Sequence, residues 1–145
     1  MTPEEFLTPE QEKRIVAAIK QAEKDTSGEI RVHLESKQKE KPSMPYVWEV
    51  FKTIGMEQTQ QKNGVLFYVD INHRNFTIMA DSGINQVVPD DFWKNITSEV
   101  IRQFKEGQYT EGLVQGILNV GKKLKQFFPY QTDDVNELPD EISKH

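Results

Sequence analysis

The sequence predicts an α/β fold in which a small mixed β-sheet is sandwiched by helices. Segments with apolar residues at helical spacing alternate with short segments that resemble strands. One of these, residues 65–69, is almost continuously apolar, which is typical of a central strand covered on both faces. The 145 residues correspond to about one domain, which is long enough to bury its own core.

The N-terminal part of the chain predicts a helix followed by a strand. Thr8 is a suitable N-cap, Pro9 occupies the first helical position, and the glutamine three residues after the cap completes a capping box. Apolar residues then recur at helical spacing over 9–24, and the polar turn 25–28 ends this helix. Residues 29–34 alternate between apolar and polar side chains and predict the first strand.

The middle of the chain predicts a short helix and a hairpin. Pro45 opens the helix and Gly55 ends it. The apolar strand at 65–70 follows, and after a polar turn residues 76–80 alternate as its antiparallel partner. Residues 81–85 are expected to form a loop.

The C-terminal part predicts two longer helices and a tail. Pro89 opens the first helix, Gly107 closes it, and Thr110 caps the second. We therefore expect one domain over residues 7–128 and a polar C-terminal tail over 129–145. This tail either docks on the domain through its few apolar residues or is mobile. The apolar residues in question are Val135, Leu138 and Ile142.

Composition excludes several classes of function. The net charge of -5 and the pI near 5.3 argue against sequence-independent nucleic-acid binding, which needs a basic surface. The absence of cysteine excludes thiol catalysis and thiolate metal sites. The N-terminal residues do not show the basic start and apolar run of a signal peptide, and none is expected. No apolar segment is long enough to span a membrane. We therefore expect a soluble cytoplasmic protein.

Acidic side chains are expected to gather at one edge of the sheet. A right-handed crossover makes the first two strands parallel, so that their N-terminal ends share an edge. The third strand returns antiparallel and ends at the same edge, which brings Asp81 toward Glu29. The turns beside this edge carry further oxygen ligands. These are Asp25, Asn85, Asp90 and Asp91.

Such a group of carboxylates predicts a divalent-cation site. Like charges held together repel one another unless a cation or a proton intervenes. Oxygen ligands on flexible loops suit Ca²⁺, whereas Mg²⁺ requires a stricter geometry and is the less suitable ion. Zinc and copper are disfavoured because there is no cysteine and no pair of histidines at metal-binding spacing. The predicted calcium ligands are Glu29 and Asp81, with some of Asp25, Asn85, Asp90 and Asp91.

A purely structural interpretation of the same residues stays open. Asp90 and Asp91 suit the positive N-terminus of the following helix, and Asp25 suits a turn. Glu29 could simply pair with a lysine or arginine. The acids of the tail could add ligands or competing charge, depending on where the tail lies. They are Asp133, Asp134, Glu137 and Asp140.

Polar residues elsewhere give weaker signals. Asp70, Asn72 and His73 lie at the opposite edge, near Glu35, and are expected to form a polar hairpin tip rather than a second site. The three histidines fall in a strand, a turn and the tail, and we expect each to be structural or on the surface. They are His33, His73 and His145.

Several short motifs resemble the TPM family. They enter the first two strands, follow the third and join the last two helices, and together they cover about residues 7–128. The motifs are Thr26–Ile30, Asn63–Leu66, Asp81–Asn85 and Gly107–Tyr109. The Phe92-Trp93 pair and the tail residues 136–142 resemble small bacterial members that carry no export signal.

The resemblance implies an α/β sandwich that forms a single TPM-like domain, with calcium binding as a further expectation. It also implies an acid-phosphatase activity that belongs to some members, while others act in protein repair or as accessory subunits. This chain departs from the exported members because it shows neither their signal peptide nor their membrane anchor.

The sequence is compatible with three functions. The first is a calcium-binding accessory or interaction domain with an unidentified protein partner. The second is a metal-dependent acid phosphatase acting on phosphate monoesters, for which the sequence offers no clear nucleophile. Arg31 and Lys94 are the nearest candidates for holding the phosphoryl oxygens, but they are isolated and the sequence does not place them in the site. The third is a protein-interaction domain in which the acidic side chains are exposed to solvent and bind no metal ion.

Overall fold

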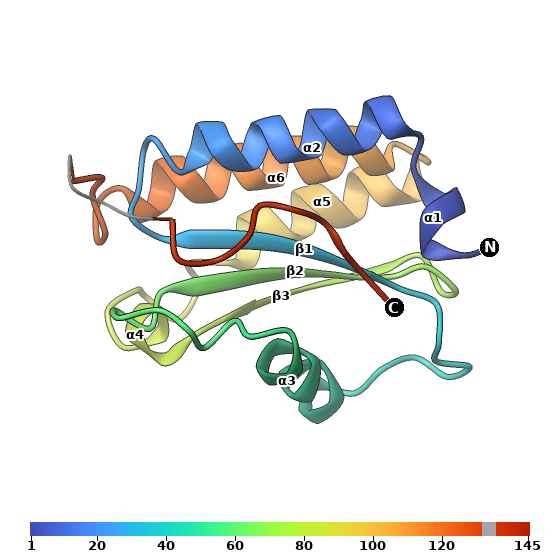
Figure 1. Cartoon of the computed structure of the whole chain (residues 1–145), viewed down its shortest axis with the longest axis horizontal. Helices are drawn as coiled ribbons and strands as arrows, with labels where there is room; N and C mark the ends of the chain where they lie inside the picture. The colour runs from blue at the N-terminus through green and yellow to red at the C-terminus, as the bar shows by residue number, and fades with distance from the viewer. Residues whose placement is uncertain (132–135) are drawn as a thin grey trace.

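A four-stranded sheet lies at the centre of the computed structural model, which describes residues 1–131 and 136–145 (Figure 1). The strands are β1 (Glu29–Glu35), β2 (Gly64–Asp70), β3 (Asn75–Ala80) and β4 (Ser143–Lys144), in the spatial order β3-β2-β1-β4. Strand β1 is parallel to both β2 and β4, whereas β3 is antiparallel to β2. The mixed sheet predicted from the sequence is confirmed.

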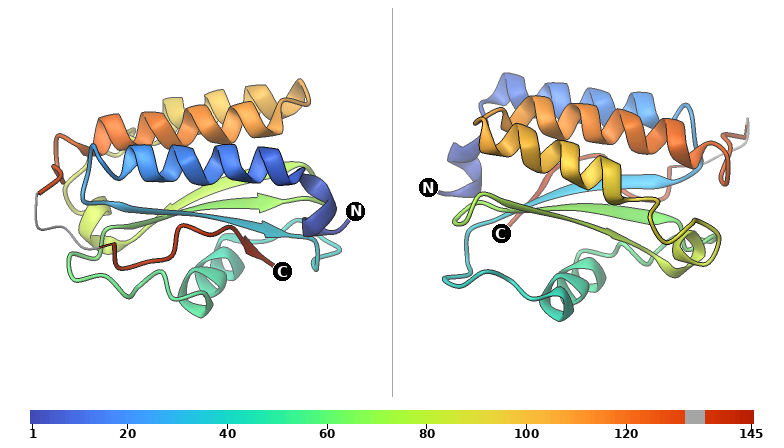
Figure 2. Two further views of the ribbon diagram at one scale, coloured as in Figure 1. Left: turned by 45° about the horizontal axis from the view of Figure 1, so that its top comes forward. Right: turned by 180° about the vertical axis from the view of Figure 1, so that it is seen from behind.

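Helices cover both faces of this sheet (Figures 1 and 2). One face carries α2 (Pro9–Ala22), α5 (Lys94–Lys105) and α6 (Tyr109–Leu124). The other face carries α3 (Met44–Thr53). The short helices α1 (Pro3–Phe6) and α4 (Ser82–Asn85) lie near opposite ends of the sheet. The sandwich architecture is therefore confirmed.

Strand β2 is central because apolar groups cover both of its faces. Val65, Phe67 and Val69 belong to the larger core cluster, on the side of α2, α5 and α6. Leu66 and Tyr68 belong to the smaller cluster, on the side of α3. All seven residues of β2 are buried, as the continuous apolar run predicts.

Two helix predictions need correction. Helix α5 begins at Lys94 rather than at Pro89. The intervening residues form turns, in which the N–H of Phe92 bonds to the carbonyl of Pro89 and that of Lys94 to the carbonyl of Asp91. These i→i+3 bonds replace the i→i+4 bonds of an α-helix. The expected loop 81–85 instead contains the single helical turn α4, because the Asp81 side chain caps the N–H of Ser82.

The described part of the tail docks on the domain. It runs beside β1 and contributes β4, in which Ser143 pairs with His33 (Figure 1). Leu138 is buried in the smaller core cluster, and Ile142 packs against the larger one. Val135 lies outside the described residues. Within the described ranges, no helix has the length and apolar character that crossing a membrane requires.

Candidate functional site

The edge predicted to carry the site contains the beginnings of β1 and β2 and the end of β3. Glu29 pairs in register with Gly64, and the backbone N–H of Asp81 donates to the Gly64 carbonyl at 3.0 Å. Gly64 therefore lies between Glu29 and Asp81. With strands about 4.8 Å apart, the Cα atoms of the two acidic residues are about 10 Å apart.

The Glu29 carboxylate holds the C-terminal tail. Its Oε2 accepts the backbone N–H of Glu137 at 2.8 Å, and its Oε1 accepts that of Leu138 at 3.1 Å. Burial raises the pKa of Glu29, and the two N–H bonds only partly oppose this effect. Both oxygens of this predicted ligand are thus engaged by the tail.

Asp81 and Asn63 each present a buried oxygen without a partner. Oδ1 of Asp81 accepts the N–H of Ser82 at 2.7 Å, but its Oδ2 bonds to nothing. Nδ2 of Asn63 donates to the carbonyl of Ser27 at 3.2 Å, whereas its Oδ1 has no partner. These are the two unsatisfied buried side-chain atoms found in the described ranges. They belong to neighbouring segments, because Asn63 directly precedes Gly64, whose carbonyl binds Asp81.

Backbone carbonyls crowd the same turn. A Cβ atom placed on Gly83 would lie 2.1 Å from the carbonyl oxygen of Gln61 and 2.6 Å from that of Lys62. The loop before β2 therefore approaches α4 so closely that only glycine fits at this position. Asp81, Asn63 and these carbonyls make the turn rich in oxygen atoms. We call this group the Asp81 turn, comprising residues 61–63 and 81–85.

The structure distributes the other predicted ligands over separate places. Asn85 lies in the Asp81 turn, where its Nδ2 donates to the carbonyl of Ala80 at 2.9 Å. Asp90 and Asp91 are exposed in the turns before α5, and Asp25 is half-buried after α2. Two acids of the tail, Asp133 and Asp134, lie outside the described residues. Asp81 and Asn85 are thus brought together, while Glu29 is separated from them by β2.

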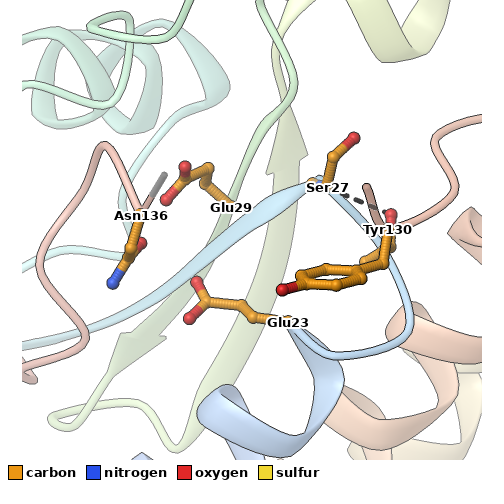
Figure 3. A pocket seen from close by; sticks show the side chains of 7 residues that line it. Glu23, Ser27, Glu29, Tyr130 and Asn136 are labelled. Carbon is orange, nitrogen blue, oxygen red and sulfur yellow. Dashed lines mark hydrogen bonds between the residues drawn. The ribbon is translucent and has the colours of Figure 1, made fainter. Parts of the chain in front are cut away.

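An acidic pocket of about 100 Å³ lies beside the start of β1, and sequence reasoning did not find it (Figure 3). Glu23, the C-cap of α2, directs its carboxyl group toward Asn136 of the tail (Figure 3). Burial raises the pKa of Glu23 to about 9, and a hydrogen bond with Asp140 and the charges of Asp140 and Glu29 add to this effect. The pocket is lined by Glu23, Thr26, Ser27, Gly28, Glu29, Tyr130 and Asn136.

Glu23 therefore carries a proton at neutral pH and shares a hydrogen bond with Asp140. In the sequence, nothing distinguishes Glu23 from other polar residues at the end of a helix. Its partners come from the tail, and only the docking of the tail brings the carboxyl groups together.

Among the residues that the structure describes, no lysine or arginine lines the acidic pocket. The two cations considered as phosphate clamps lie elsewhere. Arg31 donates to the carbonyl oxygens of Glu141 at 3.1 Å and Ile54 at 3.2 Å, and so joins the tail to the end of α3. Lys94 is exposed at the start of α5. The described pocket thus lacks the positive groups that would hold a phosphoryl oxygen.

Solved structures that resemble this chain include one that is similar in sequence and two that are more distant. The BA42 protein from the psychrophilic bacterium Bizionia argentinensis is 48% identical and has a TM-score of 0.92, with 99% of this chain and 98% of that chain covered. The N-terminal domain of a P. gingivalis protein is 22% identical, with a TM-score of 0.68 and coverage of 87% and 81%.

The N-terminal domain of the cg2496 protein from Corynebacterium glutamicum is 11% identical, with a TM-score of 0.62 and coverage of 96% and 81%. At these identities the last two structures support the fold alone. No curated protein matches the chain. A family model described as the TPM domain matches residues 1–123. The chain therefore belongs to the TPM domain family.

Proposed function

We propose that this TPM domain binds calcium at the Asp81 turn and serves as an accessory or interaction domain rather than as an enzyme. The observation that carries the proposal is the pair of buried, unpartnered oxygens, Asp81 Oδ2 and Asn63 Oδ1. Buried polar atoms nearly always have a hydrogen-bond partner, so each exception calls for a ligand, a water molecule or an ion. Both atoms are acceptors on neighbouring segments of the chain, and a cation is a ligand that takes acceptor oxygens of both kinds.

The chemistry of the turn suits calcium. Ca²⁺ takes six to eight oxygen ligands and accepts carboxylates, amide oxygens and backbone carbonyls. Asp81 and Asn63 supply the first two kinds, and the carbonyls of Gln61 and Lys62 near Gly83 supply the third. Mg²⁺ requires a smaller octahedral shell, which this set of loop oxygens suits less well. The other predicted ligands remain predictions: Asp25, Glu29, Asn85, Asp90 and Asp91.

The alternative function, metal-dependent hydrolysis of phosphate monoesters, has less support. Phosphoryl transfer needs positive groups where charge develops on the phosphoryl oxygens. The described lining of the acidic pocket offers no positive group, and the guanidinium of Arg31 already donates to two carbonyls. A carboxyl group with a raised pKa, such as that of Glu23, could donate a proton. One acid alone does not make a phosphatase site.

Thermal unfolding of chelator-treated protein, with and without calcium, tests the proposal. A ligand present at about 100 times its dissociation constant stabilises a protein by about 2.7 kcal/mol, which corresponds to several degrees for a domain of this size. Asp81→Asn is the informative variant, because asparagine caps a helix as well as aspartate does but lacks the charge. Wild type should gain this stabilisation from calcium, and Asp81→Asn should gain little.

Two control variants locate the ion. Glu23→Gln removes a carboxyl group of the acidic pocket, and Asp90→Asn removes an exposed acid before α5. Both should keep the calcium response of wild type if the ion is bound at the Asp81 turn. Loss of the response in Glu23→Gln alone would place the ion in the acidic pocket instead. A wild type indifferent to calcium, magnesium and manganese would leave only the interaction-domain interpretation.

A further inference from the structure

A second polar cluster is buried at the opposite end of β1, on the face covered by α3. His33 and Glu35 are fully buried, with relative exposures of 0% and 1%. His33 Nε2 lies 3.2 Å from Glu35 Oε1. The sequence places His33 on the first predicted strand and Glu35 directly after it, but it gives no reason to pair them with a third group. The tertiary structure supplies that group.

His145 joins the cluster because β4 pairs with β1. Ser143 lies opposite His33 in this parallel pairing, and the N–H of His145 donates to the carbonyl of Leu34 at 2.9 Å. The imidazole rings of His33 and His145 then meet edge to face, with centroids 4.6 Å apart. One ligating atom from each of His33, Glu35 and His145 lies within 4.8 Å of the others, and the described residues contain no other such group.

We propose that His33, Glu35 and His145 form a zinc site that fastens β4 to β1. Two imidazoles and one carboxylate are a common protein ligand set for Zn²⁺, with water in the fourth position. In a tetrahedral site with bonds of 2.0–2.1 Å, two ligand atoms are about 3.3 Å apart. The His33–Glu35 separation of 3.2 Å matches this spacing. The scattered histidines in the sequence had argued against zinc, and the fold removes that objection for two of them.

The groups behind these ligands resemble the outer shell of a metal site. Zinc-bound imidazoles normally use their second nitrogen for a hydrogen bond, and ligating carboxylates are themselves hydrogen-bonded. Here His33 Nδ1 lies 2.9 Å from Ser143 Oγ. The hydroxyl of Tyr68 donates to Glu35 Oε2 at 2.5 Å, which leaves Oε1 directed at His33. Each buried ligand is therefore oriented by a partner on its far side.

Metal binding at this site requires a deprotonated carboxyl group and neutral imidazoles, so that zinc and protons compete for the same ligand atoms. The site needs no ion at the Asp81 turn and is independent of the calcium proposal.

Titration of the chelator-treated full chain with Co²⁺ near neutral pH tests the inference. Tetrahedral Co²⁺ with nitrogen and oxygen ligands gives visible absorption bands, and Zn²⁺ should displace it and bleach them. Wild type should bind one equivalent. His145→Gln should abolish the bands or raise the dissociation constant more than about tenfold, and Ser143→Ala should raise it about 10- to 100-fold through the outer shell.

His73→Gln is the matched control, because His73 is a histidine that pairs with Asp70 at 2.6 Å outside the cluster. It should bind Co²⁺ and Zn²⁺ as wild type does. Glu35→Gln alters the buried network and could disturb folding, so His145→Gln, at a half-buried residue directly after β4, is the decisive variant. Absence of Co²⁺ bands together with no calorimetric zinc binding by wild type would overturn the proposal. So would equal binding by wild type and a folded His145→Gln.

Discussion

The Oε2 atom of Glu29 accepts a hydrogen bond of 2.8 Å from the backbone N–H of Glu137, which comes 108 residues later in the chain. The carboxylate at the start of β1 thereby acts as a receptor for the tail. Its other oxygen accepts the N–H of Leu138, whose side chain enters the smaller core. A residue that the sequence marks as a metal ligand thus also has a structural use.

Replacing Glu29 by glutamine should loosen the tail. A glutamine retains one acceptor but directs its NH₂ group at a backbone N–H, so that one of the two hydrogen bonds is lost and two donors face each other. Hydrogen bonds to charged groups contribute about 1.5–3 kcal/mol, and we expect a decrease of this order in the free energy of unfolding. Urea unfolding of Glu29→Gln and wild type measures this decrease in the free energy of unfolding.

Hydrogen exchange gives a local readout of the same change. The amides of Glu137 and Leu138 should exchange faster in Glu29→Gln than in wild type, while amides of β2 should change only by the global loss of stability. Glu4→Gln, at an exposed glutamate of α1, is the control and should leave these amides unchanged. Unaltered exchange at both amides in Glu29→Gln would show that the carboxylate does not hold the tail.

Leu138→Ala should destabilise the whole domain. The leucine is 6% exposed and packs in the cluster that contains Phe51 and Tyr68, between the sheet and α3. Buried leucine-to-alanine substitutions cost about 2–5 kcal/mol, through lost burial and the cavity that remains. Val87→Ala, at a residue that is 50% exposed, should cost less than about 0.5 kcal/mol. Equal midpoints for the two variants in urea would mean that the tail is not part of the cooperative unit.

Glu23→Gln should change how stability depends on pH. The folded-state pKa of about 9 lies above the ordinary value of 4.5, so the folded protein retains a proton that the unfolded chain has released. The corresponding stabilisation is complete below about pH 4.5 and is lost as the pH rises through about 9. Glutamine keeps a neutral hydrogen-bonding group at this position and does not titrate.

The variant should therefore be more stable than wild type near pH 9, by about 1 kcal/mol or more, since one unit of pKa is worth about 1.4 kcal/mol. Partial solvation of the carboxyl group keeps the difference well below the value that the whole shift would give. Near pH 5 the two proteins should unfold at similar temperatures. Parallel curves of melting temperature against pH for the two proteins would contradict the buried, protonated state of Glu23.

Gly83→Ala should separate the loop before β2 from α4. The added Cβ would lie 2.1 Å from the carbonyl oxygen of Gln61, so the backbone must move. Overpacking of this kind costs about 1–3 kcal/mol. Ser82→Ala, an exposed neighbour in the same turn, is the control and should have a smaller effect on the melting temperature. If Gly83→Ala is as stable as wild type, the close approach of the two segments is wrong.

The elements that the sequence predicts well are those whose signals are local. The capping box of Thr8 and Gln11 fixes the start of α2 and is present in the structure. The apolar run of β2 predicts its central place, and the parallel pairing of Glu29 with Gly64 follows from the crossover rule. The start of α5 was misplaced by several residues, because Pro89 is as compatible with consecutive turns as with the first turn of a helix.

The candidate sites were less predictable because their members come from distant parts of the chain. The sequence indicates that Asp81 ends a strand beside other acids, but it does not indicate that Asn63 presents a second unpartnered oxygen there. It gives no sign that Glu23 meets Asp140. In each case the partner is set by how a loop or the tail packs.

The sequence by itself determined the fold class, the order of the strands from β1 to β3 and the edge at which Glu29 and Asp81 arrive. Periodicity, capping and chain direction are local properties, and a short stretch of residues is enough to show them. Only the tertiary structure decided that the tail docks, that Glu29 accepts the amides of Glu137 and Leu138, and that His145 reaches His33. These contacts depend on a few apolar and polar groups that find partners more than a hundred residues away, and the free energy of such packing has no signature in the local sequence.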